Sequence, residues 1–244
     1  MNKAQAREHV WKDLIKVARP DSRYHFNFNE FIPDFEGSQQ ATDRLAATDL
    51  YREAGMVFIT PDNCLEDLRE RVLLDGKTQV ISTYGIRRGL VELGPGDAPD
   101  HLARYAVLLD VMEEAGRYLP LAEIQERGLK FDWMITGASA VNTSGVRFGK
   151  GHGFFDLEWA MFYSIGAVDV DTPVIAFVHD CQVVDVEFEL SPFDTVCDLI
   201  ITPTRTIEID NPQKPTQGVI WDQLEPDMMD EIPLLGELKS MQQD

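Results

Sequence analysis

Apolar and polar positions along the chain follow two periods. Short apolar runs bounded by polar or glycine-containing segments predict buried strands. Longer segments with apolar residues three and four positions apart predict helices. The predicted strands are residues 56–59, 79–82, 132–135, 174–178, 183–187 and 199–201, and the predicted helices are residues 3–18, 38–55, 65–75, 101–118 and a segment around Glu158. Because strands alternate with helices, we expect an α/β fold with a parallel sheet.

The length of 244 residues and a hydrophobic content of 44% suffice for one substantial core. We therefore expect a single domain over residues 1–244. Residues 205–244 form an acidic C-terminal extension in this interpretation. Its apolar side chains predict that it docks on the body of the domain; they are Trp221, Leu224, Met228, Met229, Ile232 and Leu234.

The charge balance restricts the possible partners. Forty-two acidic residues against 22 lysines and arginines give a net charge of −20, which repels nucleic acid and anionic membranes. We expect neither as a partner. The first twenty residues are rich in charge and lack the apolar core of an export signal, and the three cysteines lack the spacing of a metal or redox site, so a cytoplasmic protein is expected. The sequence leaves a monomer and a homodimer both open.

One glycine-rich stretch carries the clearest candidate chemistry. Glycines 145, 149, 151 and 153 are interleaved with Arg147 and Lys150, so the backbone and two cations can approach a phosphate closely. Asp156 follows at the start of the next predicted helix, where a carboxylate can hold Mg²⁺ against phosphate oxygens. His152 can contact a phosphate when it is protonated. A flexible turn between a strand and a helix is the simpler alternative.

Two other segments add candidate ligand-binding groups. Lys3 and Arg7 lie one helical turn apart and can grip one polyanion, although most charges on a terminal helix are only solvated. Asn63 lies in the loop that leaves the strand at residues 56–59. Loops of this kind gather at the ligand-binding edge of a parallel sheet.

Taken together, these segments resemble the 5-formyltetrahydrofolate cyclo-ligase family, also called methenyltetrahydrofolate synthetase. The resemblance rests on Lys3 and Arg7, on Gly76-Lys77 before a strand, on the glycine loop from Arg147 to Asp156, and on Asp194 and Asp198 ahead of Ile201-Thr202-Pro203. It covers most of the first 203 residues. It implies a three-layer α/β fold, with a mostly parallel sheet and helices on both faces, similar to the ribose-phosphate isomerase and CoA-transferase group.

The resemblance also implies an activity and a set of site residues. Family members use Mg-ATP to phosphorylate the formyl oxygen of 5-formyltetrahydrofolate, after which N10 closes the ring and phosphate leaves. Carried over by position, Asp156 and Asp194 would hold Mg²⁺, and Arg147, Lys150 and the residue at position 63 would act in the reaction. The expected ATP site comprises Lys3, Arg7, Arg147, Gly149, Lys150, Gly151, His152, Gly153, Phe154 and Phe155.

Two departures from the family pattern keep other functions open. The family has Tyr-Tyr-Asp-Arg after the glycines, where this chain has Phe154-Phe155-Asp156-Leu157. The family also places a glutamate against the folate near the position of Asn63; Glu66 or Asp67 could replace it if the alignment is shifted. The alternatives are an ATP-dependent ligase or phosphotransferase of the same fold that acts on another carbonyl or amide compound, and a nucleotide-binding regulatory relative without turnover.

Overall fold

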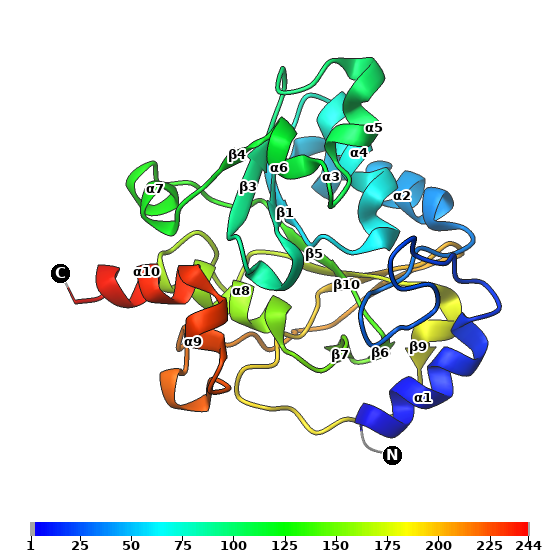
Figure 1. The fold of residues 1–244 in the computed structure, drawn as a ribbon. Helices are drawn as coiled ribbons and strands as arrows, with labels where there is room; N and C mark the ends of the chain where they lie inside the picture. Colours follow the sequence, from blue (N-terminus) through cyan, green and yellow to red (C-terminus); the bar gives the residue numbers. More distant parts are fainter. Residues whose placement is uncertain (1–2, 244) are drawn as a thin grey trace.

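A computed structural model describes residues 3–243, and a large sheet with the strand order β11-β10-β8-β5-β1-β2-β3-β4 forms its centre (Figure 1). Five inner strands run parallel to one another. They are β1 (Met56–Ile59), β2 (Thr78–Ser82), β5 (Met134–Gly137), β8 (Val174–Phe177) and β10 (Leu199–Ile201). The sequence prediction of an α/β fold with a parallel sheet is confirmed.

Antiparallel strands that the apolar pattern did not predict extend both edges of this sheet. β3 (Leu90–Leu93) and β4 (Arg117–Tyr118) follow β2, and β11 (Thr206–Glu208) pairs with β10. The pattern of β3 is hidden by Glu92, a buried carboxylate that pairs with Arg127 at 3.1 Å. A charged residue whose partners come from distant segments cannot be recognised as buried from local sequence.

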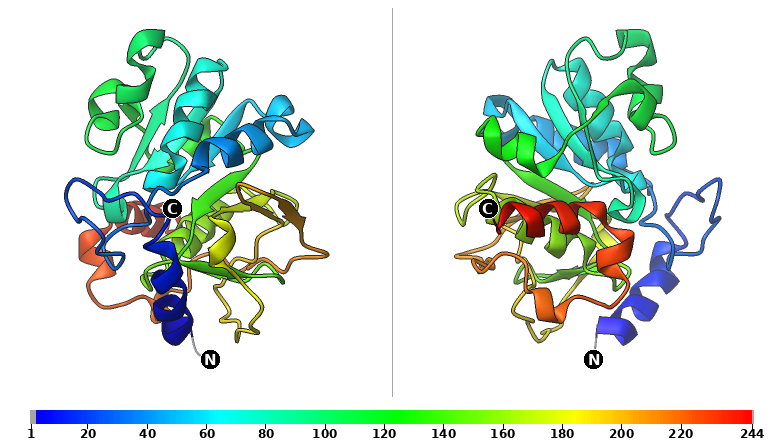
Figure 2. Two further views of the ribbon diagram at one scale, coloured as in Figure 1. Left: turned by 90° about the vertical axis from the view of Figure 1, so that its right-hand side faces the viewer. Right: turned by 60° about the vertical axis from the view of Figure 1, so that its left-hand side comes forward.

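Helices cover both faces of the sheet because successive strand residues point to opposite sides. Val57 and Ile59 pack with α2 (Ser38–Ala46) and α4 (Glu66–Leu74). Phe58, between them in β1, packs with α8 (Phe154–Ser164) on the other face. Figures 1 and 2 show α2, α3 (Asp49–Glu53) and α4 grouped on one side and α8 with the C-terminal helices on the other.

Several predicted helices are shorter or broken. Helix α1 (Lys3–Leu14) ends four residues early, and the helix expected at 38–55 is split into α2 and α3, where Thr48 caps the second helix. The helix expected at 101–118 is wrong. That segment forms η3 (Asp100–Leu102), α5 (Ala103–Ala106), α6 (Met112–Ala115) and strand β4. Two shorter helices complete this half of the chain, η2 (Tyr84–Ile86) and α7 (Leu121–Glu126).

A small second sheet with the order β7-β6-β9 supports the glycine-rich segment. It consists of β6 (Ala140–Asn142), β7 (Arg147–Phe148) and β9 (Val183–Val184), so the strand expected at 183–187 is present only as its first two residues. The short η4 (Asp180–Gln182) precedes β9. Helix α1 packs its buried Ala6 and Val10 against this region in one apolar cluster with Ala140 and Phe148. The chain start is thereby brought beside residues more than 130 positions away.

The C-terminal residues share the main core. After η5 (Trp221–Gln223) and α9 (Met228–Glu231), α10 (Pro233–Met241) buries Leu234, Leu235 and Leu238 in the cluster that contains α8. The backbone N–H of Ala122 in α7 donates to Glu237 of α10 at 2.9 Å. Within residues 3–243, no helix is both long and apolar enough to cross a membrane.

Candidate active site

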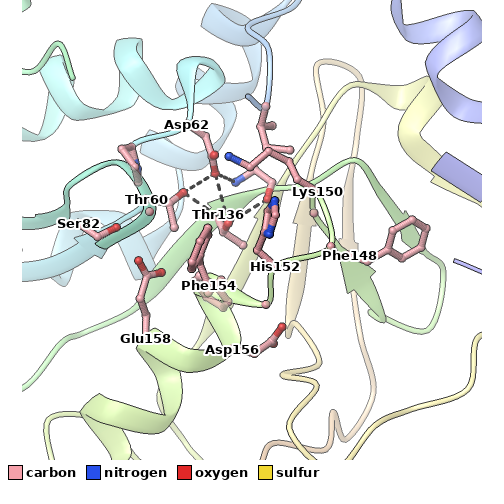
Figure 3. Close-up of a pocket in the computed structure, with 18 of the residues that line it drawn as sticks. Thr60, Asp62, Ser82, Thr136, Phe148, Lys150, His152, Phe154, Asp156 and Glu158 are labelled. Atoms are coloured by element: carbon pink, nitrogen blue, oxygen red, sulfur yellow. Dashed lines mark hydrogen bonds between the residues drawn. The ribbon is translucent and has the colours of Figure 1, made fainter. Parts of the chain in front are cut away.

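A cavity of about 340 Å³ opens at the carboxyl ends of the parallel strands (Figure 3). From β1 the chain continues to β2 on one side of the sheet and returns to β5 on the other, so β1 and β5 border the point where strand order reverses. Open α/β sheets bind ligands in the crevice at such a point. Residues that leave these strands line the cavity, among them Thr60 and Asp62 after β1, Ser82 at the end of β2, and Thr136 in β5.

The glycine loop, residues 149–153, forms another wall of the cavity between β7 and α8. Gly153 precedes α8 with φ of 66°, and Gly151 has φ of 115°, backbone conformations that favour glycine. A Cβ on Gly151 would lie 2.8 Å from a guanidinium nitrogen of Arg7. The loop therefore needs glycine at 151 both for its backbone and for the close approach of Arg7. The N–H groups of the first turn of α8 are available to an anion at this position.

The structure gathers the predicted phosphate-binding cations around this loop. Arg7 donates to the carbonyl oxygen of Gly149 at 3.3 Å, and Lys3 pairs with Asp194 at 2.6 Å. Arg147 is buried, with its guanidinium 4.2 Å from the centre of the Phe155 ring, and its Nε has no hydrogen-bond partner among residues 3–243. An unpaired buried donor beside two other cations favours an anionic ligand.

The remaining predicted loop residues lie at the rim of the same cavity. Lys150 donates to the carbonyl oxygen of Glu30 at 3.0 Å and lies 4.9 Å from the centre of the Tyr84 ring. Burial lowers the pKa of Lys150, against the opposing effect of Asp62 and Glu30. His152 stacks on Phe154, with ring centres 5.3 Å apart.

Both predicted magnesium ligands line the cavity, each beside a cation. Asp156 Oδ1 accepts from Arg147 at 2.5 Å and from the Thr195 N–H at 2.9 Å. Asp194 Oδ2 accepts from Lys3 and from the Ser191 N–H. Burial raises the pKa of Asp156, and Arg147 opposes that rise.

These two carboxylates fit a magnesium ion that is also coordinated by the phosphate oxygens of a nucleotide. Mg²⁺ prefers one or two carboxylates together with phosphate oxygens and water, rather than a site built entirely from protein ligands. The described part of the chain has no cluster of three or more histidine, cysteine or carboxylate side chains arranged to hold a metal. With only Asp156 and Asp194 as protein ligands, most coordination positions of the Mg²⁺ ion would be filled by the nucleotide and by water.

Asn63 lines the cavity, but its amide is turned towards another residue. Its Nδ2 donates to Asp21 Oδ2 at 2.8 Å. Burial opposes ionisation of Asp21, yet hydrogen bonds from Arg23, Asn63 and the N–H of Tyr24 together hold the pKa of Asp21 below its ordinary value. Asn63 therefore anchors the loop that carries Asp21 through its Nδ2.

Glu66 and Asp67, which could replace the family's glutamate if the alignment is shifted, lie outside the cavity. Glu66 and Asp67 pair with Arg104 at 3.1 and 2.6 Å, and neither lines the cavity. A shifted alignment therefore does not supply the missing carboxylate through either residue.

Sequence reasoning did not select Asp62 or Glu158 as site residues, although both carboxyl groups line the cavity. Asp62 Oδ2 accepts hydrogen bonds from Thr60 at 2.5 Å and from the Gly137 N–H at 2.9 Å. Burial raises the pKa of Glu158 to about 8; the nearby charges of Asp62 and Asp156 add to this effect, and Ser82 and Arg147 oppose it. Asp62 could have been found from its place after β1, whereas Glu158 looks like an ordinary polar residue within a helix.

A smaller cavity of about 150 Å³ lies beside the glycine loop. It shares Gly151, His152, Gly153, Asp156 and Phe193 with the larger cavity. Its other walls come mainly from α8 and the C-terminal segment, including Leu157, Ala160, Val219, Leu224 and Met228. The loop thus borders both cavities.

Comparison with known proteins gives consistent similarities. Residues 1–203 match the sequence model of the 5-formyltetrahydrofolate cyclo-ligase family. The chain is 34% identical over its whole length to the methenyltetrahydrofolate synthase domain-containing protein of Homo sapiens, and 32% identical over 98% of its length to that of Mus musculus. The chain spans 63% of the length of each of these relatives.

A solved structure supports the fold. The NMR structure of Aquifex aeolicus 5,10-methenyltetrahydrofolate synthetase matches with a TM-score of 0.54 at 14% sequence identity, over 88% of this chain and 96% of that one. At this identity the match concerns the arrangement of the elements alone.

Proposed function

Because the chain belongs to the 5-formyltetrahydrofolate cyclo-ligase family, we propose that it converts 5-formyltetrahydrofolate to 5,10-methenyltetrahydrofolate with consumption of ATP. The observation that carries this proposal is the grouping of Lys3, Arg7 and Arg147 around the glycine loop, at the edge of a cavity at the sheet's reversal point. Phosphoryl transfer requires mainly the positioning of charged oxygens by cations, and the cavity has room for a second substrate beside them.

In this proposal the glycine loop and its cations bind the triphosphate. Arg7 and Lys3 would contact phosphate oxygens from α1, and the free Nε of Arg147 would donate to another oxygen from below the loop. Asp156 and Asp194 would hold Mg²⁺, which when bound neutralises charge on the transferred phosphoryl group. Each of these carboxylates is paired with a cation, Asp156 with Arg147 and Asp194 with Lys3.

The proposed reaction forms and breaks a defined set of bonds. The formyl oxygen attacks the γ-phosphorus and ADP leaves. N10 then attacks the activated formyl carbon, its proton is lost, and the C–O bond breaks, so that inorganic phosphate departs with the former formyl oxygen. Lys150, which lines the larger cavity within the glycine loop, would interact with the transferred phosphoryl group.

The smaller cavity is the proposed place for the nucleotide base. A base in contact with Leu224 and Met228 would remain connected to phosphates on Gly151 and Gly153, because the loop lines both cavities. The larger cavity then holds the phosphates beside Lys3, Arg7 and Arg147, together with the second substrate. In this arrangement the C-terminal segment contributes directly to nucleotide binding.

A specific observation keeps a second candidate function in view. Asn63 carries no carboxylate and is engaged with Asp21. This favours an ATP-dependent ligase or phosphotransferase of the same fold that acts on another carbonyl or amide compound.

ADP release in the presence of Mg²⁺, with and without 5-formyltetrahydrofolate, distinguishes these functions. The cyclo-ligase proposal expects ADP release that depends on the folate. Equal release with and without folate would show that water accepts the phosphoryl group and that the folate does not take part. Nucleotide binding without any release would indicate a regulatory relative.

A further inference from the structure

Two buried polar atoms on one wall of the larger cavity form no hydrogen bond of normal geometry among residues 3–243, although the Ser82 hydroxyl lies close enough to Glu158 to lower the pKa of its carboxyl group. They are Oε2 of Glu158 and Oγ of Ser82, in side chains whose residues are 2% and 1% exposed. Buried polar groups in folded proteins are nearly always paired, and an unpaired group in a cavity wall indicates a ligand atom that completes the pairing. These two atoms come from separate elements, α8 and β2, and face the same cavity.

The position of this wall separates it from the phosphate-binding loop. Figure 3 shows Glu158 reaching from α8 towards Ser82 and Thr60, with Lys150 and His152 on the other side of the cavity. Asp156 leaves the same helix in another direction. Glu158 and Ser82 are therefore placed beside the carboxyl ends of β1 and β2, away from the glycine loop.

The charges around this wall disfavour a phosphate there. The charged groups that influence Glu158 are Asp62, Asp156 and Arg147, and Arg147 is paired with Asp156 and keeps only its Nε unpaired. The two carboxylates repel phosphate and attract hydrogen-bond donors. Asp62 Oδ2 is occupied by Thr60 and Gly137, so Glu158 is the carboxyl group with a buried oxygen left to pair.

From these observations we propose that Glu158 and Ser82 recognise the hydrogen-bond-donor edge of the second substrate. In a reduced pterin this edge consists of a ring N–H and the neighbouring 2-amino group. In its ionised form the Glu158 carboxyl group can accept from these donors through both oxygens, while the Ser82 hydroxyl can donate to the adjacent ring carbonyl. The inference rests on the proposed function. It places on α8 the carboxylate that position 63 lacks.

Pterin and its 2-oxo analogue lumazine test this recognition without catalysis. The binding of each is measured by calorimetry to the wild type and to Glu158→Leu, which keeps the side-chain size but removes both oxygens. Because one well-placed hydrogen bond corresponds to about tenfold in affinity, the wild type is expected to prefer pterin by about that factor. Glu158→Leu is expected to lose the preference.

Kinetics give a second readout on the same variants. Glu158→Leu is expected to raise KM for 5-formyltetrahydrofolate by about tenfold or more, with KM for ATP changed less than about twofold. Glu92→Gln is the control, because Glu92 is a buried carboxylate on β3 that does not line the cavity. If Glu158→Leu does not fold, Ser82→Ala is measured instead. It is likewise expected to raise KM for 5-formyltetrahydrofolate more than KM for ATP.

The outcomes separate the two proposals. Conversion of 5-formyltetrahydrofolate by a wild type that binds pterin and lumazine equally would overturn the recognition site alone. Discrimination between the two heterocycles without conversion would overturn the proposed function alone. A wild type that neither converts the folate nor binds either heterocycle would overturn both, and parallel losses for folate and ATP in the variants would assign Glu158 a purely structural role.

Discussion

Asp21 is a buried carboxylate that orders the loop in front of the cavity. It accepts hydrogen bonds from the backbone N–H groups of Arg23 and Tyr24, from the Arg23 guanidinium and from the Asn63 amide. All of these bonds favour the charged carboxylate over the neutral acid. Asp21 therefore links the loop to the end of β1, where the substrate cavity begins.

Substitution of Asp21 tests this link through stability and its pH dependence. Asp21→Asn should lower the free energy of unfolding by about 1.5–3 kcal/mol near neutral pH, the usual range for hydrogen bonds to a charged group. Because the folded-state pKa is lowered, the stabilisation is present above the ordinary pKa of 3.8 and is lost as pH falls through and below it. Urea denaturation at several pH values should therefore show a weaker acid-side decline in the variant. Identical pH profiles would contradict the assignment.

Substitution of Arg7 tests whether the charged residues of α1 bind phosphate or are only solvated. Arg7→Ala should weaken ATP binding by about tenfold, and less at high salt, because a cation is removed from a phosphate. Arg19→Ala is the control, since Arg19 pairs with Asp34 at 2.6 Å and does not line the cavity. Calorimetric titrations at two salt concentrations measure both. Equal affinities for the two variants would leave the charges of α1 without a role in binding.

The sequence allowed site residues to be selected by their type, but it did not reveal which residues contact one another. Arg147, the glycines and Asp156 could be selected because phosphate chemistry needs those types close together, and the structure places them along one cavity. The partner of Asn63 could not be predicted, because Asp21 is 42 residues away and meets it only through the path of the loop. Glu158 was missed for a related reason: Ser82 of β2 and Asp62 after β1, which lie near it in the cavity, are far away in sequence.

At the scale of elements, the glycine loop depends on one backbone conformation. Gly151→Ala should raise KM for ATP by about tenfold or more, because a left-handed backbone costs about 1–3 kcal/mol for a residue with a side chain, and its Cβ would meet Arg7. Gly149→Ala is the matched control, since a Cβ there has no atom within 4 Å and the backbone is not left-handed. Steady-state kinetics with ATP as the varied substrate compare the two. A larger effect at 149 than at 151 would contradict this view of the loop.

Elements were predictable where packing and pattern agree. The five parallel inner strands have both faces covered, so their apolar runs are continuous and easily recognised. The segment at 101–118 has helical spacing, yet it is divided among short helices and β4 because Arg117 and Tyr118 pair with β3. Pairing at a sheet edge depends on the neighbouring strand, which local periodicity does not describe.

At the scale of the whole molecule, the C-terminal segment belongs to the main core. Leu235 of α10 is fully buried in the cluster that also contains α8. Leu235→Ala should therefore lower the free energy of unfolding by about 2–5 kcal/mol, the usual cost of a large-to-small change in a core, with a single unfolding transition. Leu74→Ala, at an exposed position of α4, should change stability little. Two separate transitions in denaturant would instead mark the segment as an independent unit.

The distribution of charge also acts over the whole molecule. A net charge of −20 repels anions at long range, yet five cationic side chains line the larger cavity beside four carboxyl groups. The cations are Lys3, Arg7, Arg23, Arg147 and Lys150. We expect this concentration of cations to offset the repulsion of an anionic substrate. The central claim is that such a substrate, ATP, transfers a phosphoryl group to the formyl oxygen of the folate.

Transfer of an oxygen label tests this claim most directly. 5-Formyltetrahydrofolate labelled with ¹⁸O in its formyl group is converted with Mg-ATP, and the released inorganic phosphate is analysed by mass spectrometry. The proposed reaction predicts one ¹⁸O atom in each phosphate and one methenyl product for each ADP. Phosphate released without the label would show that water, and not the formyl oxygen, accepts the phosphoryl group, and would contradict the proposed function.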